Sequence, residues 1–106
     1  MCGRIVQATS PEEIAREFGA SVETSSFGGD WEPRWNLAPT SRALIVAPLD
    51  ATGTTRTVAS ARWGLVPHWA KDETLGNRLF NARAETVERL PSFRDAFKSG
   101  RVIVPI

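Results

Sequence analysis

Two strand-like runs joined by a short turn place the strongest constraint on the fold of this chain. Residues 43–47 form a continuous apolar run between Arg42 and Pro48, and residues 54–62 alternate as an amphipathic strand. The turn sequence Asp50-Ala51-Thr52-Gly53 stands between them. Runs of this kind are typical of β-strands, and a glycine-containing turn between them favours a hairpin. We therefore predict a β-hairpin over residues 43–62.

Further elements are expected before the hairpin. Residues 2–8 read as a short strand, and Ser10-Pro11-Glu12-Glu13 is typical of a helix start, with a serine cap and a proline in the first turn. Gly19 is expected to end this helix. Its inward face is expected to consist of Ile14, Ala15 and Phe18. Residues 21–33 are rich in glycine and hydroxyl side chains, which predicts a long surface loop.

The second half of the chain has weaker signals. Residues 85–90 and 92–98 are predicted to form short helical pieces, the second capped by Ser92 and ended at Gly100. Residues 101–106 form an apolar, strand-like run that would expose an edge and an apolar face, as if the fold were incomplete at this side. We expect this strand to pair with a second copy of the chain or with a missing C-terminal half.

Composition limits the classes of protein to consider. The chain has 106 residues, which suits one domain, and its net charge of +1 gives no overall attraction to nucleic acid. One cysteine and one histidine exclude an intrachain disulfide and argue against a structural zinc site. No segment approaches the length of a membrane span, and no secretion signal is evident, so we expect a reduced, cytoplasmic location.

Cys2 is the most reactive group in the sequence. It follows Met1 directly, so removal of Met1 would leave an α-amine and a thiol on adjacent carbons, both partly nucleophilic near neutral pH. The alternative is a small buried hydrophobe at the start of a strand, which is a common role for a lone cysteine. We interpret Cys2 as a nucleophile.

Four clusters of residues combine groups that are typical of a reactive site. They are Met1-Cys2-Gly3-Arg4, Arg34-Trp35-Asn36-Leu37-Ala38-Pro39-Thr40, Arg62-Trp63-Gly64-Leu65-Val66-Pro67-His68-Trp69 and Asn81-Ala82-Arg83-Ala84-Glu85-Thr86. In this order they resemble the SOS response-associated peptidase (SRAP) family, whose members attach covalently to abasic sites in single-stranded DNA. The resemblance implies an α+β, β-rich SRAP-like fold with short peripheral helices. Residues 1–106 would then be the N-terminal portion of a single domain.

The resemblance also implies roles for individual residues. The amine of Cys2 would form a Schiff base with the sugar aldehyde, and its thiol would then close a thiazolidine ring. Asn81 would hydrogen-bond the sugar as a catalytic partner, while Arg4 and Arg83 would hold neighbouring phosphates. Pro39 and Trp69 would pack against flanking bases. Gly3, Asn36 and Trp63 are candidate supports of the pocket, and no cofactor or metal is expected. The DNA partner implies a nucleoid-associated protein if the source is bacterial.

Family members are about twice as long as this chain, and their later part carries a glutamate and a histidine that assist proton transfer. Because positioned proton transfer contributes a factor of about 10² to 10⁴, we expect this chain alone to react slowly. His68 is a weaker candidate for a base, since a lone histidine in a loop is usually solvated. Glu85 either accepts a hydrogen bond from Arg83 or simply starts a helix.

Three other functions stay open at this point. A peptidase or self-processing activity is implied by the family's name, and we rank it second. A glutamine amidotransferase that begins Met-Cys-Gly would use the thiolate on an amide, but its further motifs are not found in this sequence. A noncovalent single-strand binding module would use Trp69 and the arginines, yet it leaves Cys2 without a role.

Overall fold

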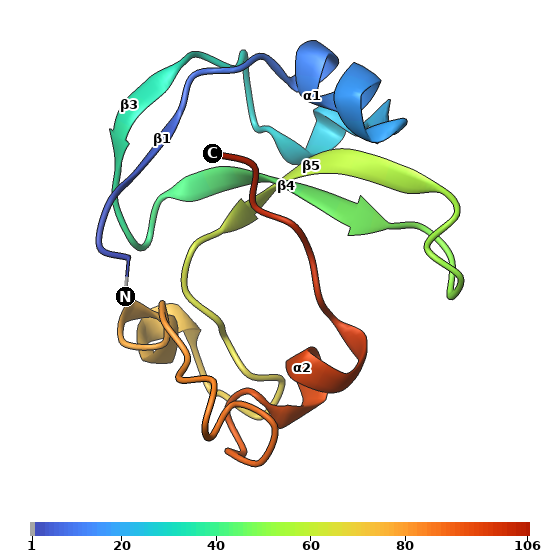
Figure 1. Ribbon diagram of the computed structural model, residues 1–106. Helices are drawn as coiled ribbons and strands as arrows, with labels where there is room; N and C mark the ends of the chain where they lie inside the picture. Colours follow the sequence, from blue (N-terminus) through green and yellow to red (C-terminus); the bar gives the residue numbers. More distant parts are fainter. Residues whose placement is uncertain (1) are drawn as a thin grey trace.

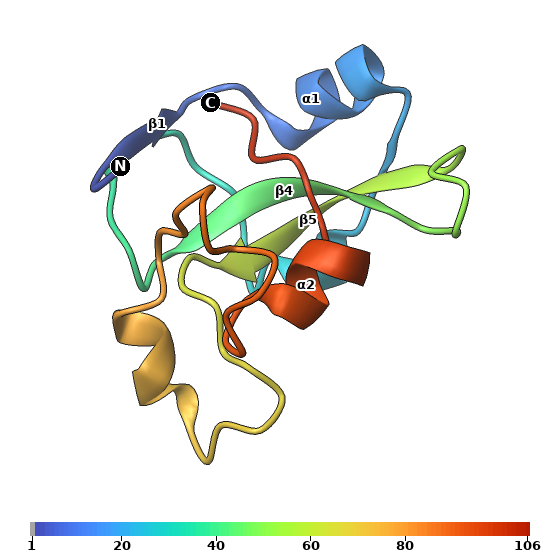
Figure 2. The same cartoon turned by 60° about the horizontal axis from the view of Figure 1, so that its bottom comes forward.

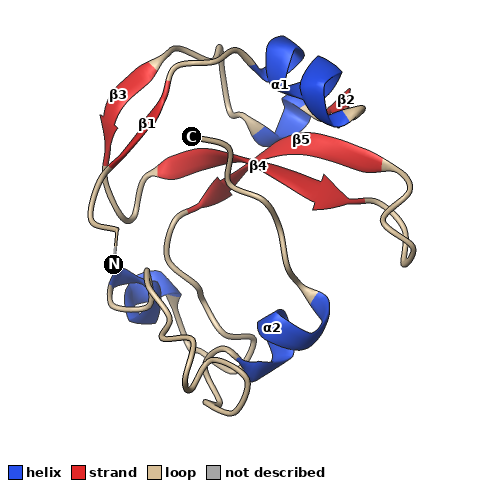
Figure 3. Cartoon of the chain, viewed as in Figure 1, coloured by secondary structure: helices blue, strands red, loops and turns tan. Residues whose placement is uncertain are grey.

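The computed structural model describes residues 2–106, so the predicted removal of Met1 lies outside the described residues. Figure 1 and Figure 3 show how the helices and strands are arranged. In chain order the elements are β1 (Ile5–Gln7), α1 (Pro11–Phe18), β2 (Ser21–Val22), the 3₁₀ helix η1 (Thr24–Ser26), β3 (Arg34–Leu37), β4 (Arg42–Pro48), β5 (Arg56–Arg62), the 3₁₀ helix η2 (Glu73–Asn77) and α2 (Arg94–Ser99). This mixture is the α+β class that we predicted.

The predicted hairpin is confirmed, and it supplies two strands of a three-stranded sheet with the order β2-β5-β4, in which β5 is central. β4 and β5 pair antiparallel from Arg42 opposite Arg62 to Pro48 opposite Arg56. Asp50 organises the turn by accepting hydrogen bonds from both the hydroxyls and the N–H groups of Thr52 and Thr55. The hydroxyl bonds hold the pKa of Asp50 well below its usual value, so the turn carries a charged acceptor at neutral pH.

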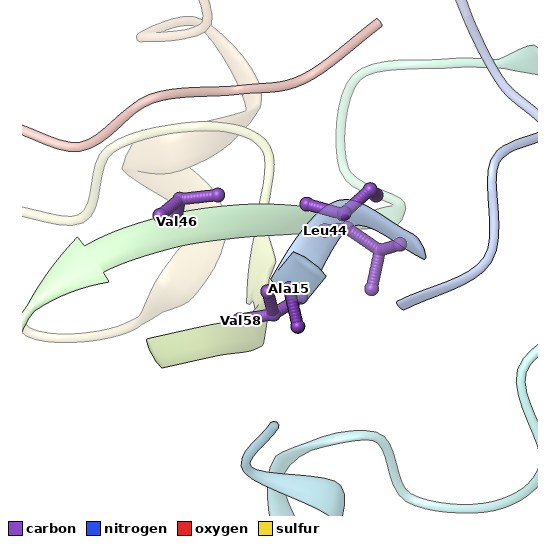
Figure 4. Close-up of a cluster of buried hydrophobic side chains, with 5 residues drawn as sticks. Ala15, Leu44, Val46 and Val58 are labelled. Atoms are coloured by element: carbon purple, nitrogen blue, oxygen red, sulfur yellow. The ribbon is translucent and has the colours of Figure 1, made fainter. Parts of the chain in front are cut away.

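Helix α1 forms for the reasons that the sequence indicates. The Ser10 hydroxyl accepts a hydrogen bond from the N–H of Glu13 at 3.2 Å, and Gly19 ends the helix in the left-handed conformation at φ 61°. Its inward residues pack on one face of the β4–β5 sheet (Figure 4). The buried cluster consists of Ile14, Ala15, Leu44, Val46 and Val58, with Val58 fully buried.

The opposite face of the same sheet is built differently. The chain leaves β5 away from α1, passes through η2 and α2, and returns across β4, as Figures 1 and 2 show from two directions. The side chains of Ala43, Ile45 and Ala61 point to this side and line a pocket instead of meeting a helix. One layer of the molecule is therefore a packed core. The other is more open, because Ile45 and Ala61 border a pocket, although Ala43 and Ala59 are buried there.

Gln7 joins three parts of the chain that are distant in sequence. Its side chain is buried, with 3% exposed, although it belongs to a short apolar strand. The amide group donates to the carbonyl of Leu44 and accepts from its N–H, at 2.9 and 2.8 Å. The same nitrogen donates to the carbonyl of Pro105 at 2.8 Å. Since buried backbone groups need partners, this amide fixes β1 and the last residues against β4.

Three sequence predictions need correction. Residues 21–33 are not loop throughout, because Ser21 and Val22 form β2, a parallel partner of β5, and η1 follows. A two-residue strand has no periodicity to detect, and its partner lies far along the chain. Residues 85–90 form consecutive turns, and no helix is assigned there. Helix α2 begins with Phe93 at its cap and no side-chain capping bond, so the prediction of a Ser92 cap is wrong.

Residues 101–106 also differ from the prediction of a full strand. They make one antiparallel bridge, between Ile103 and Val46, through backbone hydrogen bonds of 2.8 and 3.0 Å. Val102, Ile103 and Val104 are each 44 to 50% exposed, and Ile106 is 82% exposed. The predicted apolar exposure is therefore confirmed, but the pairing is limited to one point. No helix among the described residues is long and apolar enough to cross a membrane.

Candidate functional site

Cys2 and Asn81 form a two-way contact between residues 79 positions apart. The side-chain nitrogen of Asn81 donates to the carbonyl of Cys2 at 2.8 Å. The backbone nitrogen of Cys2 donates to the side-chain oxygen of Asn81 at 3.4 Å. Cys2 itself is exposed and is not part of a disulfide. The asparagine thus holds the backbone on both sides of the Cys2 α-carbon and leaves the thiol free.

Asn81 is positioned by the segment that follows β5. The N–H of Leu65 donates to the carbonyl of Leu79 at 2.8 Å, and the indole nitrogen of Trp63 donates to the carbonyl of Phe80 at 2.9 Å. The rings of Trp63 and Phe80 meet edge to face, with centroids 6.4 Å apart. These contacts tie the segment that carries Asn81 to the residues directly after β5. Trp63 therefore contacts the residue next to Asn81, and it lines the same pocket as Cys2.

The backbone at Gly64, directly after Trp63, passes very close to the backbone at Gly76 in η2. Gly64 has φ 129°, and a Cβ at this residue would collide with the carbonyl oxygen of Gly76. Only glycine fits such a crossing. The guanidinium of Arg62 donates to the carbonyl of Glu73 at 2.9 Å and to the side chain of Asn77, which fixes η2 beside the crossing. At its start, Asp72 accepts from the hydroxyl of Thr74, which lowers the pKa of this carboxyl group.

A mainly apolar pocket of about 390 Å³ opens beside Cys2. Its lining comes from β4, β5, the segment after β5 and the last residues of the chain. The lining residues are Cys2, Ile5, Ala43, Ile45, Ala61, Arg62, Trp63, Gly64, Leu65, Leu79, Asn81, Val102, Val104 and Ile106. Among these, Arg62 is the charged residue, and its guanidinium is engaged with η2. Cys2 and Asn81 therefore lie together in the lining of a mainly apolar pocket, and the charged group of Arg62 is directed to η2.

Pro39 lies in a strained turn that is hydrogen-bonded to the backbone of Trp63. Thr40, the next residue, has φ 75°, which is costly for a β-branched side chain. The N–H of Thr40 donates to the carbonyl of Trp63 at 2.8 Å, and the N–H of Trp63 donates to the carbonyl of Ser41 at 2.9 Å. The half-buried Pro39 is thus held at a fixed place relative to Trp63.

The other predicted site residues lie on the surface. Gly3, Arg4, Asn36 and Arg83 are exposed, and Trp69 is 52% exposed. None of these five lines the pocket beside Cys2. Such positions suit contacts with a large ligand outside the pocket better than contacts with a buried small molecule.

The weaker candidates lie elsewhere. The ring nitrogen Nδ1 of His68 is 3.8 Å from a carboxylate oxygen of Asp95 on α2, and His68 does not line the pocket. Glu85 is exposed, and no side-chain bond joins it to Arg83 in the described part of the chain. Across residues 2–106, no group of three or more His, Cys, Asp or Glu residues is placed to hold a metal ion.

Sequence reasoning missed three residues that hold the site together. No role was predicted for Gln7, although a glutamine in an otherwise apolar strand is a signal for a buried amide. Leu79 and Phe80 act through their backbone carbonyls, which accept from Leu65 and Trp63. Every residue has a backbone carbonyl, so no sequence signal could have identified these two residues.

Comparison with known proteins finds one matching family and several similar proteins. The family model "SOS response associated peptidase (SRAP)" matches residues 1–106. Abasic site processing protein YoqW of Bacillus subtilis is 36% identical over 105 residues, covering 99% of this chain and 45% of YoqW. Abasic site processing protein YoaM of the same organism is 35% identical over 99% of this chain. Abasic site processing protein HMCES of Xenopus tropicalis is 23% identical over 98% of this chain.

A solved structure shares the fold. The crystal structure of a protein from Bordetella bronchiseptica superposes with a TM-score of 0.63 at 22% identity, covering 91% of this chain and 43% of that protein. The chain spans less than half the length of YoqW and of the Bordetella protein. The structural comparison supports the arrangement of strands and helices described above.

Proposed function

The chain belongs to the SRAP family, and we propose that it recognises abasic sites in DNA and bonds to them covalently through Cys2. The observation that carries this proposal is the two-way contact between Cys2 and Asn81. It places an exposed thiol, and the backbone nitrogen of the same residue, beside a side chain that both donates and accepts hydrogen bonds. The names of the relatives YoqW and HMCES point to the same substrate.

The proposed reaction uses both nucleophiles of Cys2 after removal of Met1. The amine attacks the aldehyde carbon of the ring-opened abasic sugar, and loss of water gives an imine. The thiol sulfur then bonds to the imine carbon, and the thiol proton moves to the nitrogen. The product is a thiazolidine ring that joins the protein to the DNA, with water as the released molecule. An internal cysteine lacks the free amine, so this chemistry requires Cys2 at the chain start.

Asn81 is the proposed catalytic partner in this reaction. In the structure its amide bonds to the nitrogen and the carbonyl of Cys2. The amide is therefore positioned to orient the freed amine and to donate to the departing oxygen of the sugar. Its own position depends on the contacts of Leu65 and Trp63 with residues 79 and 80.

We propose that single-stranded DNA runs over the surface around Cys2. Arg4 and Arg83 are exposed and would contact phosphates, which fixes the strand without reading its sequence. Trp69 and Pro39 would pack against flanking bases, and stacking on an aromatic ring contributes about 1 to 3 kcal/mol per base. Gly3 and Asn36, also exposed, would border the strand.

The chain by itself is proposed to react slowly. No carboxylate or imidazole belongs to the lining of the pocket beside Cys2 in the described part of the chain. A positioned proton donor typically contributes a factor of about 10² to 10⁴. Residues 1–106 are proposed to be the N-terminal portion of one domain, in line with their coverage of less than half of YoqW. The remaining portion is the proposed source of the proton-transfer groups.

The proposal is tested by incubating the purified chain with a single-stranded oligonucleotide that contains one abasic site. Wild-type protein is expected to give an adduct that survives denaturation, while Cys2→Ala gives none. Cys2→Ser keeps the amine but lacks the thiol, so it should form an imine that is trapped only after borohydride reduction. Asn81→Ala should lower the rate about 10- to 100-fold and leave the adduct's mass unchanged.

Intact mass spectrometry supplies the first control, because a retained Met1 blocks the amine. An adduct of full yield on protein that retains Met1 would contradict the thiazolidine mechanism. Reversible binding without any adduct would instead favour the noncovalent binding module. Added acetate or imidazole should accelerate the wild-type reaction if proton transfer is the slow step.

A further inference from the structure

The pairing of β1 with β3 contains an irregularity at its centre. Ile5 is opposite Leu37, but Gln7 is opposite Arg34, so two residues of β3 stand against the single residue Val6. The two residues are Trp35 and Asn36. One extra residue of this kind is a β-bulge, which redirects the side chains of the bulged strand.

The bulge explains the unusual exposure of Trp35. Strict alternation from the buried Leu37 would turn Trp35 to the inner side of the β1–β3 ribbon. In the structure Trp35 is 71% exposed, and its bulge neighbour Asn36 is exposed too. Val6, across the ribbon, is 45% exposed. An exposed tryptophan beside an exposed amide and an apolar side chain offers both stacking and hydrogen-bonding groups.

The charges on this ribbon are of one sign. Residues 2–11 and 33–41 contain two arginines, Arg4 and Arg34, and no aspartate or glutamate. Both arginines are exposed. The chain as a whole has a net charge of only +1, so this local excess is a feature of the ribbon and not of the composition. It complements a polyanion.

The ribbon is continuous with the candidate site. β1 begins three residues after Cys2, and β1 and β3 lie side by side at one side of the molecule, next to the N-terminus (Figures 1 and 2). Val6 is four residues beyond Cys2, a distance of about 13 Å along an extended backbone. A ligand that starts at Cys2 and follows β1 would therefore reach Trp35 within a few nucleotides.

We propose that the outer face of the β1–β3 ribbon, at Val6 and Trp35, extends the contact surface for single-stranded DNA beyond Arg4 and Asn36. Trp35 stacks on a base a few nucleotides away from the abasic site, and Arg34 contacts a nearby phosphate. This inference rests on the proposed function, because the path of the strand starts at Cys2. The combination of an exposed aromatic ring with exposed arginines is the pattern of sequence-independent single-strand binding.

The test measures reversible binding of undamaged, fluorescently labelled DNA by anisotropy, so it does not depend on adduct formation. Two oligonucleotides are compared, one of about three nucleotides and one of about twelve, which lies within the site sizes of single-strand binding folds. Trp35→Ala should weaken binding of the longer DNA about 10-fold and leave the shorter unchanged. Trp35→Phe should stay within about 3-fold of wild type because it keeps a stacking ring. Leu49→Ala removes a comparably exposed apolar side chain, 61% exposed, in the β4–β5 turn and should have no effect.

Equal affinity of wild type and Trp35→Ala for the longer DNA would overturn the inference, and so would an equal loss with both lengths. A shift in self-association on Trp35→Ala with unchanged DNA affinity would assign the surface to a protein partner and would also overturn it. The proposed function fails separately, through absence of an adduct on short abasic DNA. The two failures are therefore distinguishable.

Discussion

The two faces of the β4–β5 sheet contrast in how they are covered. On one face, α1 packs Ile14 and Ala15 against Leu44, Val46 and Val58, and these side chains are at most 8% exposed (Figure 4). The other face carries Ala43 and Ala59, which are buried, and it borders a pocket of about 390 Å³ at Ile45 and Ala61. The apolar residues that cover it belong to a terminal segment that bridges the sheet only at Ile103.

This contrast suggests that one face of the sheet stabilises the fold and the other shapes the surroundings of Cys2. A tightly packed layer resists changes of shape, and it holds the strands that carry the site. The open layer leaves a pocket beside Cys2, where the proposed DNA ligand would approach. We expect substitutions on the packed face to lower the stability of the fold and substitutions on the open face to alter mainly the surroundings of Cys2.

The strongest test compares two neighbours that point to opposite faces. Leu44→Ala should lower the free energy of unfolding by about 2 to 5 kcal/mol, because Leu44 is 3% exposed and its loss leaves a cavity. Ile45→Ala removes the same number of carbon atoms from the open face and should cost about 1 kcal/mol. Urea denaturation measures both. Equal losses would show that the two faces are packed alike.

Substitution of Gln7 tests whether its side-chain amide fixes the last residues of the chain against β4. Gln7→Leu keeps the size of the side chain but leaves the N–H and carbonyl of Leu44 without their partner, a loss of about 1 to 3 kcal/mol. Hydrogen exchange should accelerate at Leu44 and also at Ile103, because the bond to Pro105 is lost as well.

The matched control for Gln7 is Ser21→Ala. This change removes a hydrogen bond of 3.3 Å from an exposed hydroxyl to the carbonyl of Arg56. It should change stability by less than about 0.5 kcal/mol. If exchange at Ile103 is the same in Gln7→Leu and wild type, the amide does not anchor the terminal segment.

Enlarging a side chain should distinguish a filled layer from an open one. Ala15→Phe inserts a ring into the packed face, where Ala15 is 8% exposed, and should destabilise by about 1 to 3 kcal/mol. Ala61→Phe places the same ring in the pocket beside Cys2 and should cost less than about 1 kcal/mol. Thermal unfolding gives the comparison, and a larger loss at Ala61 would mean that the pocket closes in solution.

The smallest expected effect concerns the turn at Pro39. Thr40→Gly removes a β-branched side chain from φ 75° and should relieve about 1 to 2 kcal/mol of strain. Glycine also makes the unfolded chain more flexible, which offsets part of this gain. A net stabilisation of about 0.5 kcal/mol is expected, with Ser41→Gly as the control that lowers stability. A loss of stability in Thr40→Gly would show that the Thr40 side chain contributes contacts of its own.

Local signals explain which parts of the fold were predictable. The β4–β5 hairpin and helix α1 each depend on periodicity, a turn or a cap within a few residues, and both were predicted correctly. β2 was missed because its two residues gain strand character only by pairing with β5, and Ser21 is opposite Thr57. The strand predicted for residues 101–106 is only one bridge in the structure. An apolar sequence forms a full strand only when a neighbouring strand pairs with all of its residues, and here β4 pairs only with Ile103.

The candidate site divides in a similar way. Cys2 and Asn81 were selected from residue type and motif, and the structure brings them within hydrogen-bonding distance. The residues that position Asn81 could not be selected in this way. Leu79 and Phe80 act through backbone carbonyls, which every residue type has. Trp35 shows the same limit, because the bulge that turns it outward is a property of the β1–β3 pairing.

The sequence by itself determined the candidate site residues, the hairpin, the first helix and the resemblance to the SRAP family. Each of these depends on residues that are close in the chain or on side-chain chemistry. Only the tertiary structure decided that one face of the sheet is packed and the other open, that Gln7 joins three segments, and that Asn81 meets Cys2. The physical reason is that these contacts join distant residues through backbone groups and packing. Such groups are the same in every residue, so their partners are fixed by the fold and not by the local sequence.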